Sequence, residues 1–179
     1  MRVVELVLPG LKLIEPKVFG DSRGHFLETW NAGRYAHHGI PGPFVQDNLS
    51  RSARNTVRGL HFQDPNAQGK LVSVVAGAVW DVAVDMRRAS PAFGKWFGVE
   101  LSAENRRQLW VPEGFAHGFA VLSEFADFAY KVTAPYSPHD EHCLRWDDPA
   151  LGIDWKIDPA AAILSERDRA APGLARYAP

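Results

Sequence analysis

The chain has 179 residues, 46% of them hydrophobic, and its formal net charge at pH 7 is −1. This length and composition predict one domain, residues 1–179, and the balanced charge argues against nucleic acid as a partner. No run of about 18 apolar residues is present to span a membrane, so no membrane association is expected. The single cysteine, Cys143, and the lack of a signal-peptide-like apolar run favour a cytoplasmic protein.

Glycine, proline and other turn residues divide the chain into short apolar segments. Residues 11–19 and 25–29 predict a β-hairpin, and residues 31–38 predict one or two helical turns. Residues 160–171 contain helix formers, with a possible start near Ser165. The other predicted strands are 44–49, 56–62, 70–76, 78–85, 96–101, 107–111, 116–121 and 127–133.

Residues 78–85 show the clearest strand pattern, because polar and apolar side chains alternate there. Asp81 and Asp85 fall on one face of the predicted strand, opposite Trp80, Val82 and Val84. Many short strands with few helices predict an all-β fold of antiparallel strands, either a closed barrel or a double sheet. Periodicity alone does not choose between these two architectures.

His61 lies in a predicted strand whose one face carries Gly59, His61 and Gln63, which is typical of a cavity wall. An ordinary surface or core histidine is the alternative interpretation. The segment 112–119, which contains His117, resembles the second sequence motif of the cupins, small jelly-roll barrels with polar residues inside. The resemblance implies a cupin-type jelly-roll barrel of antiparallel strands with short flanking helices and a small C-terminal helical segment.

In metal-binding cupins the histidine at the position of His117 is a ligand, and the first motif supplies His-x-His. Here that motif reads His61-Phe62-Gln63, so one histidine is missing, and Lys70 follows nearby. Two histidines are fewer than the three protein ligands that most catalytic metal sites use, and a lysine repels a cation. We therefore expect a cupin that has lost its metal.

Lys70, Tyr130 and Asp168 each have an ordinary interpretation, as a strand-end lysine, a sheet residue and a helix-face carboxylate. Together with several ordered segments, however, they give the chain a resemblance to the dTDP-4-dehydrorhamnose 3,5-epimerase family over essentially its whole length. The segments that carry the resemblance are 19–28, 46–50, 58–61, 69–72, 112–119, 130–131, 146–149 and 165–168.

The resemblance implies proton transfer beside a ketone at C4 of a nucleotide-linked sugar, without metal or redox cofactor. His61 would be the base, and Asp168 would orient its imidazole and stabilise the imidazolium. Lys70 would face the enolate oxygen, and Tyr130 would return a proton on the opposite face of the ring.

The resemblance also implies how the nucleotide sugar is bound. Arg58 and Arg23 suit diphosphate oxygens, because each guanidinium offers paired N–H donors. Gln46 and Asn48 would contact sugar or phosphate oxygens. His117 would line the sugar pocket, and Tyr136 would pack on the thymine. Family members are homodimers with crossed N-terminal strands, which would place Arg23, Phe26 and Glu28 in the site of the partner.

Two positions depart from the family pattern. Arg167 stands where relatives often have lysine, and Ala134-Pro135-Tyr136 replaces a more usual pair of aromatic residues.

Three alternatives share parts of this pattern. A single-position epimerase, acting at C3 or C5 only, would have the same four chemical residues. A metal-dependent cupin would contain stoichiometric metal. A non-catalytic sugar-binding jelly roll would bind the nucleotide sugar without exchanging its hydrogens.

Overall fold

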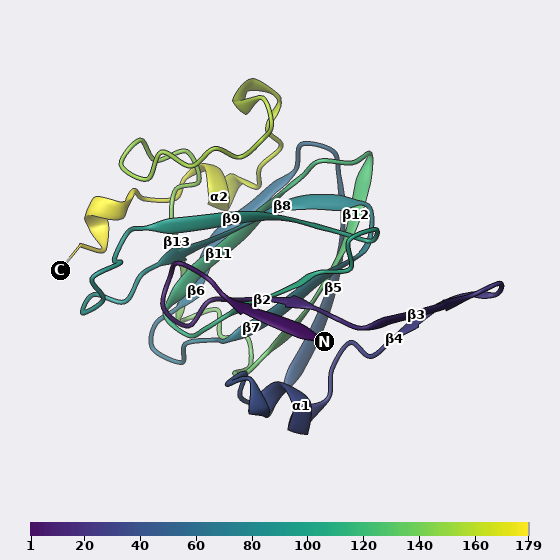
Figure 1. The fold of residues 1–179 in the computed structure, drawn as a ribbon. Helices are drawn as coiled ribbons and strands as arrows, with labels where there is room; N and C mark the ends of the chain where they lie inside the picture. Colours follow the sequence, from purple (N-terminus) through teal and green to yellow (C-terminus); the bar gives the residue numbers. More distant parts are fainter. Residues whose placement is uncertain (179) are drawn as a thin grey trace.

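The computed structural model describes residues 1–178 and contains two large antiparallel sheets and one two-stranded hairpin (Figure 1). The six-stranded sheet has the order β1 (Arg2–Glu5), β2 (Lys12–Glu15), β10 (Gln108–Val111), β7 (Lys70–Ala76), β12 (Phe125–Val132) and β5 (Gln46–Ala53). The five-stranded sheet has the order β13 (Glu141–Cys143), β6 (Val57–Gln63), β11 (Phe115–Val121), β8 (Ala78–Asp85) and β9 (Trp96–Ser102). The hairpin pairs β3 (Val18–Asp21) with β4 (Gly24–Leu27).

Helices are few and short in the described residues. They are α1 (Ala32–His37), α2 (Glu166–Arg169) and the 3-10 turns Pro159–Ala161 and Leu174–Arg176. None of these helices has the length and apolarity needed to cross a bilayer. The predicted all-β fold with short flanking helices and a small C-terminal helical segment is therefore confirmed.

The two sheets face each other across the main core. Alternate side chains of β7, β10 and β12 meet those of β8, β9 and β11 there, among them Val72, Leu109, Phe128, Leu101 and Phe119. This interleaving is what period-two patterning produces when two sheets bury their facing sides. The polar residues that interrupt this face define the candidate site.

A second apolar cluster lies on the outer face of the five-stranded sheet, where the C-terminal segment covers it. Leu60, Val82 and Ala116 of the sheet pack with Trp146 and Trp155 of that segment. This packing places α2 against β6, as Figure 1 shows near the top of the molecule. The burial of this segment therefore determines where Asp168 lies.

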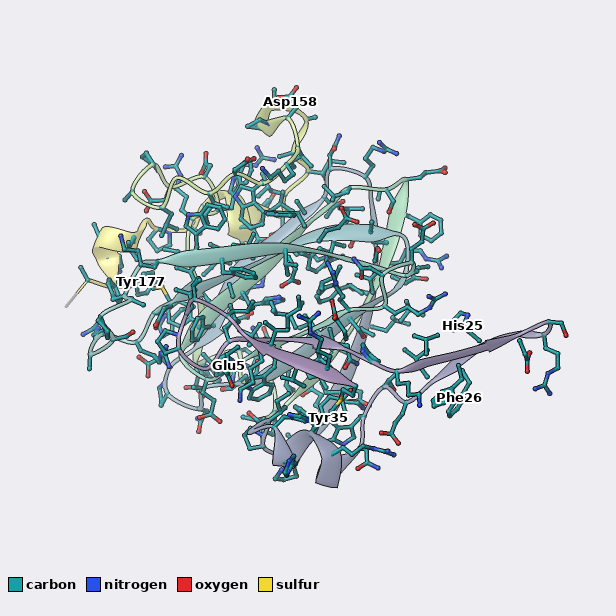
Figure 2. The ribbon with its side chains drawn as sticks, in the orientation of Figure 1. Glu5, His25, Phe26, Tyr35, Asp158 and Tyr177 are labelled. Carbon is teal, nitrogen blue, oxygen red and sulfur yellow. The ribbon has the colours of Figure 1, made fainter. Side chains whose placement is uncertain are left out.

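The outer face of the six-stranded sheet is covered only in part. Ile14, Leu71 and Trp110 pack under Tyr35 of α1, whereas Leu49 and Val75 remain largely exposed. The β3–β4 hairpin projects away from both sheets, and Figure 2 shows His25 and Phe26 along it.

Several predicted boundaries are wrong. The segment 11–19 contains two strands, β2 and β3, with Pro16 between them, because proline donates no backbone hydrogen bond to a ladder. The expected helix in 160–171 is only the four residues of α2, although Ser165 does cap it. The strands β1 and β13 were not predicted.

Strands β6 and β11 approach unusually closely where Gly59 lies beside Gly118. A Cβ atom at Gly118 would lie 2.5 Å from the backbone oxygen of Arg58 and 3.0 Å from Cα of Gly59. The two strands also change register between His117 and Phe119. Glycine at both positions therefore lets the two strands approach where their polar side chains meet.

Replacing Gly118 with alanine should destabilise the fold by about 1–3 kcal/mol, because the methyl group overlaps a backbone that cannot easily move. Chemical denaturation of the purified variant measures this loss. Gly33→Ala in α1 is the matched control, since its Cβ would have only ordinary contact at 3.7 Å and alanine favours a helix. Equal stability of the Gly118 variant and the wild type would contradict the close approach.

Candidate active site

His61 and Asp168 form a hydrogen-bonded pair although 107 residues separate them in sequence. Nε2 of His61 lies 2.6 Å from Oδ1 of Asp168, whose side chain is 4% exposed. Burial raises the pKa of Asp168, but the hydrogen bond from His61 and further polar contacts outweigh burial and lower that pKa below its usual value. An ionised Asp168 holds the ring with a proton on Nε2, which leaves the Nδ1 lone pair free to accept a proton.

Lys70, the first residue of β7, is buried beside His61. Its Nζ donates a hydrogen bond to the backbone oxygen of His61 at 3.1 Å. Burial lowers the pKa of Lys70 to about 8, and the negative charges of Glu141 and Asp81 oppose that shift. Lys70 is therefore still mostly protonated at neutral pH, and it provides a poorly solvated positive charge.

Tyr130 on β12 extends toward the same place from the six-stranded sheet. Burial raises the pKa of its hydroxyl, so the group stays protonated at neutral pH. His61, Lys70 and Tyr130 line one cavity of about 180 Å³. The cavity is also lined by Ser50, Arg58, Gln68, His117, Gly118, Phe119, Phe128, Tyr136 and Glu141.

His117 forms a second histidine–carboxylate pair, which no sequence pattern predicts. It lies directly across the β6–β11 ladder from His61. Its Nε2 is 2.9 Å and 3.0 Å from the two carboxylate oxygens of Asp81, which is fully buried. The alternation in residues 78–85 assigned Asp81 to a face of β8, but only the fold brings it to His117.

Four of the residues expected to bind the nucleotide sugar, Arg58, Tyr136, Gln46 and Asn48, lie in or beside the cavity. Arg58 donates to Ser52 at 2.9 Å and lines the cavity. The backbone nitrogen of Tyr136 donates to Gln46 at 3.0 Å, and Gln46 donates to Asn48 at 2.8 Å. Gln46 and Asn48 are thus neighbours of the cavity on β5 and do not line it.

Arg23, Phe26 and Glu28 are not brought to the cavity of their own chain. Arg23 and Phe26 belong to the exposed β3–β4 hairpin, which Figure 2 shows extending away from the sheets. Arg23 pairs with Asp21, and Glu28 accepts a hydrogen bond from Arg34 at 2.7 Å. Their assignment to the site of a partner stays a prediction.

Glu141 is a residue of the candidate site that no sequence pattern indicates. Its carboxylate accepts hydrogen bonds from the hydroxyl of Tyr136, at 2.7 Å, and from Arg167. Burial raises the pKa of Glu141, but these two hydrogen bonds and the nearby positive charges together outweigh burial and lower the pKa, so the group is ionised. The three-residue strand β13 has no periodicity from which this position could have been predicted.

The positions that bind metal in cupins do not form a ligand set here. Gln63 donates to the backbone oxygens of Asn66 and Pro135 and accepts from the backbone of Ser137. The Nε2 atoms of His61 and His117 each face a carboxylate. The side chains at these three positions therefore do not suit a shared cation.

Comparisons with known proteins show the family of the chain. The chain matches the sequence model of the dTDP-4-dehydrorhamnose 3,5-epimerase family over residues 5–176. It is 55% identical to the dTDP-4-dehydrorhamnose 3,5-epimerase of Pseudomonas aeruginosa, over 94% of this chain and 93% of the relative. It is 53% identical to the protein of the same name from Salmonella typhimurium, over 97% of this chain and 96% of the relative.

A solved structure shows the same fold in complex with a nucleotide sugar. The structure is a dTDP-6-deoxy-D-glucose-3,5-epimerase from Legionella pneumophila with dTDP-4-keto-L-rhamnose. It superposes with a TM-score of 0.95 at 51% identity, covering 99% of this chain and 97% of that chain. This cupin-type chain therefore belongs to the dTDP-4-dehydrorhamnose 3,5-epimerase family.

Proposed function

We propose that the chain converts dTDP-4-dehydro-6-deoxy-D-glucose to dTDP-4-dehydro-L-rhamnose by inverting C3 and C5 of the sugar, in dTDP-L-rhamnose biosynthesis. The observation that carries the proposal is the single cavity that His61, Lys70 and Tyr130 line, with Asp168 bonded to the ring of His61. The names of the relatives and the sugar bound in the Legionella protein support it.

His61 would remove the proton, acting through Nδ1 because Nε2 faces Asp168. The protons on C3 and C5 are weakly acidic because each flanks the C4 carbonyl, so removal of either gives an enolate. Proton transfer by a positioned side chain accelerates such a step by about 10²–10⁴-fold. Asp168 would stabilise the imidazolium that forms.

Lys70 and Tyr130 would complete the reaction. A buried ammonium beside the C4 oxygen stabilises the enolate charge more strongly than water does, because it is poorly solvated and already in place. Tyr130 approaches from the six-stranded sheet, opposite the sheet that carries His61. It would return a proton to the opposite face of the sugar ring and so invert the carbon. No metal or redox cofactor is needed for these steps.

Substrate binding would use the polar groups in and beside the cavity. Arg58 would bind diphosphate, Tyr136 would pack on the base, and His117, fixed by Asp81, would contact the sugar. Gln46, which accepts a hydrogen bond from the backbone of Tyr136, would contact sugar or phosphate oxygens beside that residue. Asn48, which accepts from Gln46, would do the same next to Gln46.

The partner is proposed to be a second copy of the chain. Leu49 and Val75 are exposed on the outer face of the six-stranded sheet, and Phe19 and Phe26 are exposed on the hairpin. An isolated two-stranded hairpin is marginally stable in water, so contact with another surface would stabilise this one. Arg23, Phe26 and Glu28 would then reach the site of the partner.

Co-expressing Arg23→Ala with His61→Ala should restore activity if Arg23 serves the partner. In a mixed dimer, one site then combines an intact His61 with an intact Arg23 from the other chain. Random pairing would give roughly a quarter of wild-type activity, since half of the dimers are mixed and each has one intact site. Activity that stays at the level of the separate variants would place Arg23 in its own site.

We also propose that residues 1–179 act as one domain and that the protein is cytoplasmic. A nucleotide-sugar substrate and a buried free thiol, Cys143, both suit a reducing biosynthetic compartment.

Proton NMR in D₂O with dTDP-4-dehydro-6-deoxyglucose tests the function directly. We expect deuterium at both C3 and C5, with the L-lyxo product trapped by a reductase. Deuterium at one carbon alone would indicate a single-position epimerase, and binding without exchange would indicate a non-catalytic sugar-binding protein.

A further inference from the structure

The buried thiol of Cys143 lies beside the proposed catalytic pair. Cys143 on β13 is directly opposite His61 on β6, and its side chain is almost fully buried. Its Sγ donates to Oδ1 of Asp168 at 3.4 Å, and the same oxygen contacts Nε2 of His61 at 2.6 Å. The proposed epimerisation gives this sulfur no role.

The three side chains present donor atoms of the kinds that zinc prefers. A ring nitrogen of His61, Sγ of Cys143 and a carboxylate oxygen of Asp168 all lie within 4.8 Å of one another, and Nε2 is the nitrogen that faces Asp168. Zinc bonds of about 2.0–2.3 Å place the ligand atoms of a tetrahedron roughly 3.3–3.8 Å apart. The sulfur–oxygen distance already fits, and a small rotation of the imidazole would widen the nitrogen–oxygen distance.

We propose that His61, Cys143 and Asp168 form a binding site for a thiophilic divalent cation such as Zn²⁺, and that its occupation switches off the base. Asp168 and a thiolate together would balance the charge of the cation. His61 is 30% exposed, which allows access from the cavity and a water as the fourth ligand. The positive charge of Lys70 does not lie among the proposed ligands, because its Nζ contacts the backbone oxygen of His61, whereas the three donor atoms meet at the far end of the imidazole ring.

The inhibition follows from the tautomer of His61, and this part rests on the proposed function. A neutral imidazole has one proton, which lies on Nε2 when that atom donates to Asp168. A cation can bind Nε2 only through a lone pair of that nitrogen, so the imidazole proton moves from Nε2 to Nδ1. The proton of the Cys143 thiol leaves to solvent when the sulfur binds the cation. Nδ1 then has no lone pair with which to accept a proton from the sugar.

Cobalt and zinc binding to untagged, metal-free protein tests the site without any activity assay. We expect about one equivalent per chain, and a thiolate-to-cobalt charge-transfer band with Co²⁺. Cys143 is the only cysteine in the chain, so such a band in the wild type can come from no other residue. Absence of the band, or absence of zinc binding in competition with a chromophoric chelator, would overturn the proposal.

Cys143→Ser and Cys143→Ala should each remove the band and weaken zinc binding by about 100-fold or more, since even supporting residues of metal sites contribute 10–100-fold. His37→Ala, which removes an exposed histidine of α1, is the control for surface binding. Unchanged zinc affinity in both cysteine variants would also overturn the proposal.

Zinc should inhibit the wild-type epimerase, and EDTA should reverse the inhibition. The epimerase activity of each cysteine variant with zinc is compared with the activity of the same variant without metal. We expect zinc not to inhibit either cysteine variant. Equal inhibition of variants and wild type would contradict the switch. If the wild type shows the cobalt band but has no epimerase activity even without metal, the metal site is supported and the proposed function is refuted.

Discussion

Replacing His61 with alanine should lower kcat by about 10²–10⁴-fold, the usual contribution of a positioned general base. The physical reason is that the group held in place by Asp168 is the one expected to accept the sugar proton. Deuterium exchange at C3 and C5 should fall by the same factor, because exchange requires the same proton removal.

Nucleotide binding separates this loss from general damage. The affinity of the His61 variant for dTDP, measured by calorimetry, should stay close to that of the wild type, because the proposed diphosphate and base contacts involve other residues. His37→Ala is a matched control, since it removes an exposed histidine on α1. Near-normal turnover by the His61 variant would show that the base is another residue.

Replacing Lys70 with methionine should lower kcat by about 10²–10³-fold, the loss seen when one stabilising group for a developing oxyanion is removed. Methionine keeps most of the volume of the buried side chain, so the loss reports the missing charge rather than a cavity. Binding of dTDP should change little, because the ammonium is expected to face the C4 oxygen.

The pH profile adds an independent measurement for Lys70. Its pKa is about 8, because burial disfavours the charged form. The cation is present below that pH and is lost as pH rises through it, so kcat/KM of the wild type should decline above about pH 8. The methionine variant should lack this decline, and a variant that keeps it would show that another group titrates there.

Much of the fold follows from local patterns in the sequence. Alternation along residues 78–85 matches β8, and Ser165 caps α2 because a serine side chain can accept from the backbone at that position. Boundaries were less predictable, because Pro16 divides β2 from β3 and α2 ends shortly before Pro172, which cannot continue a helix.

Some site residues could be predicted only through the family resemblance. His61 lies on a strand face that already suggests a cavity wall, but Lys70, Tyr130 and Asp168 are ordinary when taken singly. Their roles are proposed only because they stand in ordered segments that resemble that family. No local property of α2 distinguishes Asp168 from any other helix carboxylate.

The sequence by itself determined the all-β class, the main strands and the identity of the proposed catalytic residues. Only the tertiary structure decided which side chains around the site meet: Asp168 with His61, Asp81 with His117, and Glu141 with Arg167. The reason is physical, because each pair joins different strands, helices or loops whose approach depends on packing across the whole barrel. The position of Cys143 beside the proposed catalytic pair has the same origin, since β13 is too short to be recognised until it pairs with β6.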